Sequence, residues 1–270
     1  MNIRKIYVVL IVLLSMGLFY EWTSGNRSEV QLRHMELVDV LARDYSYSSG
    51  DEYIFLENNL LEIKIAIATG AIVESRLKDY GVENIPGSLG VRVFGSDDRG
   101  VFKYYLKTGF TGSSSSKGYS LASYGKDYVE LFDAENGFRK RFSFLPASYE
   151  IQIEDISESG SGGKAFASMY RTEGMALDLK TNFSDGGMMN SSSYQGVGFN
   201  TSKEGYVKSR LSGIDDPVTV SSRSGWISFI QKYFFAALIG SDDYVYNYFA
   251  QPASDGVYRM GYTVDKSETQ

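Results

Sequence analysis

The chain of 270 residues contains no cysteine and a single histidine, His34. Without cysteine it can form neither disulfides nor thiolate nucleophiles, and Cys-ligated metals are excluded. One histidine cannot build a multi-histidine metal site, so any acid–base chemistry would rest mainly on carboxylates, Lys or Tyr. Because His34 lies in a polar stretch, we interpret it as an ordinary solvated residue. We expect neither a metal nor a cofactor.

The chain also lacks an excess of basic residues. It has 27 Lys and Arg against 33 Asp and Glu, a net charge of -6. Affinity for nucleic acid is dominated by attraction between basic side chains and phosphates, which this balance opposes. We therefore do not expect nucleic acid as a partner.

Proline is scarce, with four residues, whereas Tyr (21) and Gly (28) are abundant. Aromatic side chains suit the pleated surface of a sheet, and glycine suits turns. A hydrophobic content of 43% is enough for one large core or two modest ones. The composition predicts a β-rich globular protein.

Period-2 alternation locates the strands. Leu61, Ile63, Ile65 and Ile67 alternate with more polar residues, which places one face on a core and the other towards water. Further strand candidates are residues 71–77, 91–94, 101–110, 127–133, 138–145, 148–156, 165–172, 204–211, 217–222, 244–251 and 257–264. Turn-like residues 133–137 and 146–148 separate successive hairpins. This pattern predicts an all-β fold, a large β-sandwich.

The N-terminal segment places Arg4 and Lys5 before an apolar run, Ile6–Tyr20, that is followed by Glu21 and Trp22. The run is short for a membrane span, so a signal-peptide core and an anchor are both considered. Large aromatic residues follow it where a cleavage site requires small ones, which favours an uncleaved anchor. The basic residues predict a cytoplasmic N-terminus. We expect a transmembrane helix at 1–22, a polar tether at 23–51 and an exported domain at 52–270.

Motifs for catalysis are scarce. Ser114 and Lys117 match a Ser-x-x-Lys pattern, but in a run of four serines we attribute the match to chance. Two Gly-Ser-Asp-Asp stretches, 95–98 and 240–243, fit turns better than calcium loops. A pair of carboxylates that cleaves glycosides stays open, since only their separation in space would identify one. We predict no catalytic residue and no enzyme.

One aromatic segment near the C-terminus, Ser221–Ile239, is predicted as a helix. Its apolar run is too short for a membrane span and is interrupted at Gln231 and Lys232. Residues at i, i+3, i+4, i+7 and i+8 from Trp226 form one apolar helical face, which we expect to pack on the sandwich. Ile227, Phe235 and Ile239 lie off that face, where they meet a second layer or form an exposed docking patch.

Four segments resemble a known family. The anchor, residues 60–80, 138–156 and 194–239 are similar, in that order, to the N-terminal half of YidC membrane protein insertases. The most specific part of the likeness lies in residues 225–235. Its motif residues, which are also candidates for partner docking, are Gly225, Trp226, Phe229, Tyr233, Phe234 and Phe235.

The resemblance implies a bacterial inner-membrane protein with a cytoplasmic N-terminus, a single anchor and a large periplasmic domain. The implied fold is a β-supersandwich similar to galactose mutarotases, here without the histidine that mutarotase chemistry uses. The implied partners are the Sec translocon, through SecDF, or a separate insertase core. Fold alone does not carry the function.

The family's insertase activity belongs to a C-terminal bundle of five transmembrane helices. No apolar stretch after Tyr20 approaches 18 residues, so we expect this chain to lack that core. A truncated or split family member and a stand-alone paralogue both stay open. Function is expected to be non-enzymatic support of membrane-protein insertion or folding. The alternative, suggested by 14% aromatic residues, is a periplasmic carbohydrate-binding or sugar-modifying sandwich.

Overall fold

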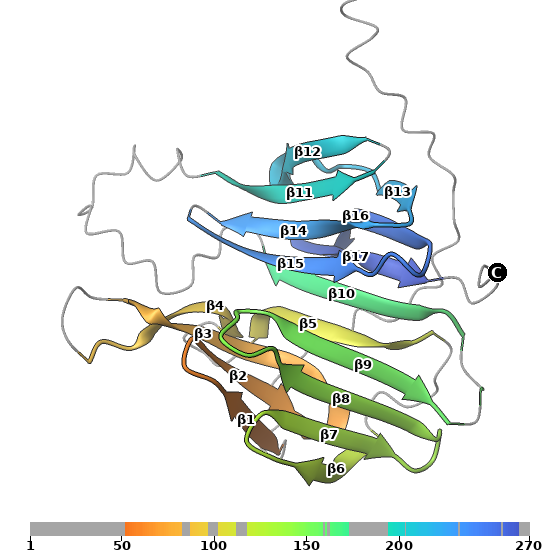
Figure 1. Ribbon diagram of the computed structural model, residues 1–270. Helices are drawn as coiled ribbons and strands as arrows, with labels where there is room; N and C mark the ends of the chain where they lie inside the picture. The colour runs from red at the N-terminus through yellow and green to blue at the C-terminus, as the bar shows by residue number, and fades with distance from the viewer. Residues whose placement is uncertain are drawn as a thin grey trace, which may run out of the picture. The chain divides into compact units, whose positions relative to one another are not determined.

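A computed structural model gives the structure of the chain (Figure 1). It describes residues 52–82, 87–96, 102–111, 118–158, 160, 163–172, 194–202, 204–231, 233–254 and 256–264. The predicted anchor with Arg4 and Lys5, the predicted tether, and the residues His34, Ser114 and Lys117 lie outside these ranges. Within the described part, none of the helices has the length and apolar character needed to cross a bilayer.

The described residues form strands and two single-turn 3₁₀ helices, η1 (Ile67–Thr69) and η3 (Leu211–Gly213). The strands are β1 (Tyr53–Glu57), β2 (Leu61–Ala66), β3 (Ala71–Gly81), β4 (Gly90–Ser96), β5 (Phe102–Phe110), β6 (Tyr119–Tyr124), β7 (Tyr128–Asp133), β8 (Phe138–Phe144), β9 (Ile151–Ser157), β10 (Ala165–Thr172), β11 (Gln195–Thr201), β12 (Gly205–Arg210), β13 (Val218–Ser222), β14 (Gly225–Gln231), β15 (Phe234–Gly240), β16 (Tyr246–Ser254) and β17 (Val257–Val264). The prediction of an all-β fold is confirmed.

The strands are arranged in three antiparallel sheets. The large sheet has nine strands in the order β1-β2-β3-β4-β5-β10-β17-β16-β13. The two smaller sheets have the orders β6-β7-β8-β9 and β12-β11-β14-β15. In Figure 1 the smaller sheets lie one above the other, in front of the large sheet.

One hydrophobic core joins all three sheets. Leu131 and Phe142 of the β6–β9 sheet pack with Ile63 of β2, and Phe199 of β11 packs in the same core as Met260 of β17. Each of these side chains is nearly or fully buried. The period-2 alternation of the sequence therefore reports which face of each strand meets this core.

The helix predicted for Ser221–Ile239 is wrong. The segment contains the end of β13 and the antiparallel hairpin β14–β15, in which Gln231 pairs with Phe234. The helical spacing of its apolar residues arose because both faces of this hairpin carry apolar side chains, which hides the alternation of a strand. Trp, Ile, Phe and Tyr, which dominate the segment, prefer strands.

Candidate functional site: the β14–β15 hairpin and the crevice beside β4

Gly225, the first residue of the predicted motif, begins β14 at a point where the backbones of β14 and β11 approach closely. Its φ is +134°, and a Cβ atom here would lie 2.3 Å from the backbone oxygen of Asn200 on β11. The hydroxyl of Tyr248 on β16 donates a hydrogen bond to the Gly225 oxygen at 2.9 Å. Only glycine fits this position, which joins the small sheet to the large one.

Phe229 occupies the inward face of β14. Its side chain is fully buried and meets the Tyr104 ring edge to face, with ring centroids 5.5 Å apart. The guanidinium of Arg171 lies 6.0 Å from the Phe229 ring and 5.5 Å from the Tyr104 ring. Phe229 is a core residue, as the sequence analysis expected, although it lies on a strand.

The remaining motif residues are divided between two faces. Phe235 and Tyr233 are exposed, at 67% and 76%, whereas Phe234 is half-buried on the inward face of β15. Trp226 is half-buried on the outward face of β14, where its ring lies 5.9 Å from that of Tyr206. The predicted single helical face is therefore two strand faces that point in opposite directions.

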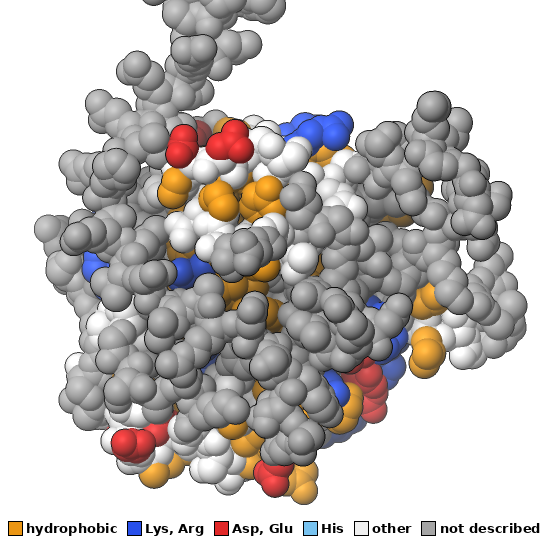
Figure 2. All heavy atoms as spheres, turned by 180° about the vertical axis from the view of Figure 1, so that it is seen from behind, with side chains coloured by type: hydrophobic (Ala, Val, Ile, Leu, Met, Phe, Trp, Pro, Cys, Tyr) orange, Lys and Arg blue, Asp and Glu red, His pale blue; other side chains and the backbone are white. Residues whose placement is uncertain are grey.

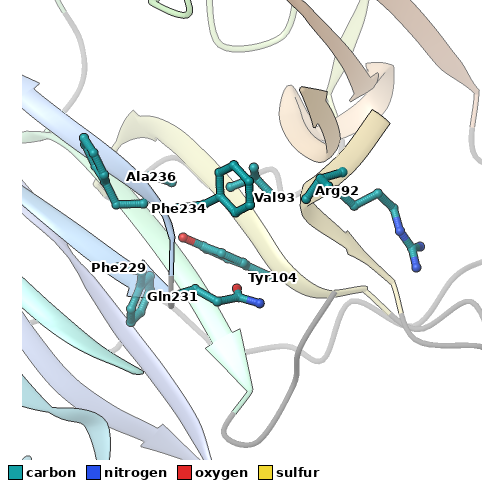
Figure 3. Close-up of a pocket in the computed structure, with 9 residues that line it drawn as sticks. Arg92, Val93, Tyr104, Phe229, Gln231, Phe234 and Ala236 are labelled. Carbon is teal, nitrogen blue, oxygen red and sulfur yellow. The ribbon is translucent and has the colours of Figure 1, made fainter. Parts of the chain in front are cut away.

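Phe234 lines a shallow crevice between β15 and β4. β4 pairs with β5 only at Gly95 and Ser96, so its first half diverges from β5 and contacts β15. The crevice is lined by Val91, Arg92, Val93, Tyr104, Phe229, Gln231, Phe234, Phe235 and Ala236. In Figure 3, Tyr104 lies between Phe234 and Gln231, and the Arg92 side chain extends away from the aromatic rings.

The lining of the crevice is mainly apolar and aromatic. None of the nine lining residues is an acid, a histidine or a hydroxyl nucleophile other than the Tyr104 phenol. The pKa of Tyr104 is raised because the phenol is buried, which the nearby Arg171 only partly offsets. Elsewhere in the described ranges, no group of three His, Asp or Glu residues could hold a metal ion. The lining is therefore mainly apolar, with Gln231 and Arg92 as its polar side chains besides the Tyr104 phenol.

Comparison with known proteins identifies the family to which the chain belongs. The sequence model of the YidC periplasmic domain matches residues 54–269, which run from the second residue of β1 to beyond the end of β17. The chain belongs to the YidC periplasmic domain family. Phe229, Phe234 and Gly225 lie within the matched range.

Relatives with the name "Membrane protein insertase YidC" are similar to the chain over most of its length. The protein of Azotobacter vinelandii is 26% identical over 240 residues, which cover 80% of this chain and 41% of the relative. A Pseudomonas putida protein is 27% identical over 237 residues, 78% of this chain and 40% of the relative. The chain thus spans about two fifths of the length of these curated relatives.

Beneath the crevice, this YidC-type domain buries a cation that was not predicted from the sequence, Arg171. Arg171 of β10 donates to the Gln195 side-chain oxygen at 3.2 Å and to the Ile230 backbone oxygen at 3.5 Å. Burial lowers the pKa of Arg171, and the interaction with Tyr104 opposes that shift. The sequence did contain a sign of this burial, because the period-2 alternation that starts with Ala167 and Met169 places Arg171 on the core face of β10.

Proposed function

We propose that the chain acts as a YidC-type periplasmic domain that supports the insertion or folding of membrane proteins by binding another protein. In this proposal Ile6–Tyr20 anchors it in the bacterial inner membrane, with Arg4 and Lys5 on the cytoplasmic side. The observation that carries the proposal is the family match over residues 54–269, which spans the whole sandwich. Two small sheets on one large sheet are consistent with the β-supersandwich that the family resemblance implies.

The proposed contact surface is the rim of the crevice beside β4. Tyr80, at the end of β3, is 50% exposed and packs edge to face on Phe234 with centroids 5.4 Å apart. Leu89, immediately before β4, is 70% exposed. Apolar side chains exposed at the edge of a crevice are typical of a surface that binds a polypeptide. The partner we propose is a Sec component such as SecDF or an insertase core, and binding involves no catalysis by this chain.

The alternative function, carbohydrate binding, requires exposed aromatic rings around a cleft. Five of the described tyrosines, among them Tyr246 and Tyr248, are instead buried in the interior. Tyr246, Tyr248 and Tyr262 contact one another there with centroids 4.8 to 5.9 Å apart. Tyrosine packing between strands accounts for much of the aromatic content, so the described residues favour the protein-binding function.

A site-specific crosslinker tests the proposal. A photoreactive residue replaces Leu89 in the full chain, and a matched variant carries it at Tyr124 of β6, which is 68% exposed. After irradiation of intact cells, mass spectrometry identifies the captured proteins. We expect Sec components or an insertase core to be enriched from position 89 over position 124. Equal capture at the two positions, or no Sec or insertase component at position 89, contradicts the proposed function.

A further inference from the structure

The outward face of the β12-β11-β14-β15 sheet carries a group of apolar and aromatic side chains. The strand register aligns three rows across it. The rows are Arg210–Gly196–Ile230–Phe235, Lys208–Gly198–Ser228–Ala237 and Tyr206–Asn200–Trp226–Ile239. We call these twelve positions the outer face.

Three large apolar or aromatic residues of the outer face are exposed in spite of their size, and two more, Trp226 and Ile230, are half-buried. Phe235, Ile239 and Tyr206 have exposed fractions of 67%, 62% and 56%. A Cβ atom at Gly198 would meet the side chain of Ile230 at 2.9 Å and that of Tyr206 at 3.4 Å, so these two side chains lean over β11 from both sides. The apolar surface is therefore continuous from β12 to β15, and such a surface on a soluble domain marks an interaction site.

The charge of the outer face is opposite to that of the chain. Its ionisable side chains are Lys208 and Arg210, which are both exposed on β12, and Tyr206. No carboxylate projects from it, although the chain has a net charge of -6. The nearby acids Glu204 and Asp242 lie in turns beyond the strand ends at the Tyr206–Ile239 row. Seen from behind, by contrast, the described surface shows acidic and basic side chains together (Figure 2).

We propose that the outer face docks onto a bilayer surface that contains anionic phospholipid. Aromatic rings and aliphatic side chains enter the interfacial region, where Trp and Tyr are favoured. The two basic residues pair with lipid phosphates, since basic residues near an anionic bilayer are attracted to it. The whole outer face, from the Phe235 row to the Trp226 row, then lies on the lipid, and the acids Glu204 and Asp242 lie beyond its edge, past the strand ends.

The length of chain before β1 is compatible with this contact. The inference relies on the anchor of the proposed function, Ile6–Tyr20, to bring the domain to the membrane. Even fully extended, residues 23–51 span no more than about 100 Å, so the domain cannot leave the neighbourhood of the bilayer. Tethering makes docking an intramolecular event, for which modest affinity is sufficient.

The test uses the purified full chain in lipid nanodiscs. Because the sequence has no cysteine, a single Ala237→Cys substitution gives one site for an environment-sensitive fluorophore and leaves Phe235 and Ile239 intact. The matched control carries the same label at Tyr124→Cys, on the β6–β9 sheet. Emission is compared between discs of phosphatidylcholine alone and discs that also contain phosphatidylglycerol, with and without quencher-bearing lipid.

We expect a blue shift and lipid quenching at position 237 in discs with phosphatidylglycerol, and little response at position 124. A Lys208→Gln/Arg210→Gln variant should lower the ratio of docked to undocked chain by about 30-fold. Phe235→Asp should also abolish the shift, while thermal unfolding shows that the domain still folds. Equal responses at positions 237 and 124, or equal responses in the two lipids, overturn the inference.

The purified system contains no partner protein. A missing response at position 237 therefore overturns lipid docking, and is the result expected if the outer face binds a protein instead. Co-elution of the chain with the nanodisc reports the anchor separately. Failure of lipid docking therefore leaves the crosslinking test at Leu89 unaffected, and failure at Leu89 leaves the nanodisc result unaffected.

Discussion

The ammonium of Lys140 on β8 lies 2.9 Å from Oδ1 of Asp155 on β9, in the interior of the protein. The side chain of Lys140 is fully buried and that of Asp155 is 13% exposed. The same ammonium donates to the backbone oxygen of Thr108 at 2.7 Å and to its hydroxyl at 2.6 Å. Because Thr108 belongs to β5, these bonds tie the β6–β9 sheet to the large sheet.

Lys140→Met should lower the free energy of unfolding by about 3 kcal/mol, because it leaves the Asp155 carboxylate in the interior without its cation. The measurement is urea denaturation followed by circular dichroism. The control is Lys78→Met, which removes an exposed ion pair with Glu57 and should cost less than about 1 kcal/mol. Equal losses in the two variants would show that the buried pair has no special weight.

Gly70→Ala should disturb the same interior cation. Gly70 has a φ of +60°, and an added Cβ would lie 2.8 Å from Cδ of Lys140, whose far end is held by Asp155 and Thr108. The control Gly87→Ala has a φ of +79° with open space around it, so it carries only the backbone strain of about 1–2 kcal/mol. The loss in free energy of unfolding should be larger for Gly70→Ala than for this control by at least about 1 kcal/mol, as measured by urea denaturation. A loss no larger than that of Gly87→Ala would contradict the close contact.

Phe229→Ala and Phe235→Ala should differ sharply in stability. Phe229 is fully buried against Tyr104, so its truncation should cost about 3–5 kcal/mol. Phe235 is 67% exposed, and its truncation should change stability by no more than about 0.5 kcal/mol. Thermal and urea unfolding of the two variants measure the difference. Similar costs would mean that the two residues share one buried face, as in a helix.

Alkaline pH should destabilise the domain. Burial raises the pKa of Tyr104 and of Tyr262, so both phenols stay protonated in the folded state at a pH where they ionise in the unfolded chain. Their contribution is complete below a pH of about 10 and is lost as the pH rises above it, because the unfolded state then binds fewer protons. Above that pH, each of the two buried phenols should lower the free energy of unfolding by up to about 1.4 kcal/mol per pH unit. Urea denaturation from pH 8 to 11 measures the slope, and Tyr104→Phe or Tyr262→Phe should reduce it; an unchanged slope would contradict the assignment.

Much of the fold could be predicted from local patterns. Alternation in residues 61–65 and 138–144 places Ile63 and Phe142 on the core side, where the structure has them. The same alternation fails at the β14–β15 hairpin, since Ile230 and Phe235 are apolar on the outward face as well. Between Gln231 and Phe234 the sequence carries no Gly, Asn or Asp that would indicate a hairpin.

The sequence by itself determined the fold class, the family and, for most strands, which residues face the core. These depend on composition, on the order of the motifs and on a period of two residues. Tertiary structure alone decided which residues meet across sheets. Arg171 with Tyr104, and Lys140 with Thr108, come from strands 67 and 32 residues apart in the chain, and their contact depends on how the sheets pack. It also decided that Phe235 is exposed beside Ile230, because exposure depends on whether another layer covers that face of the sheet.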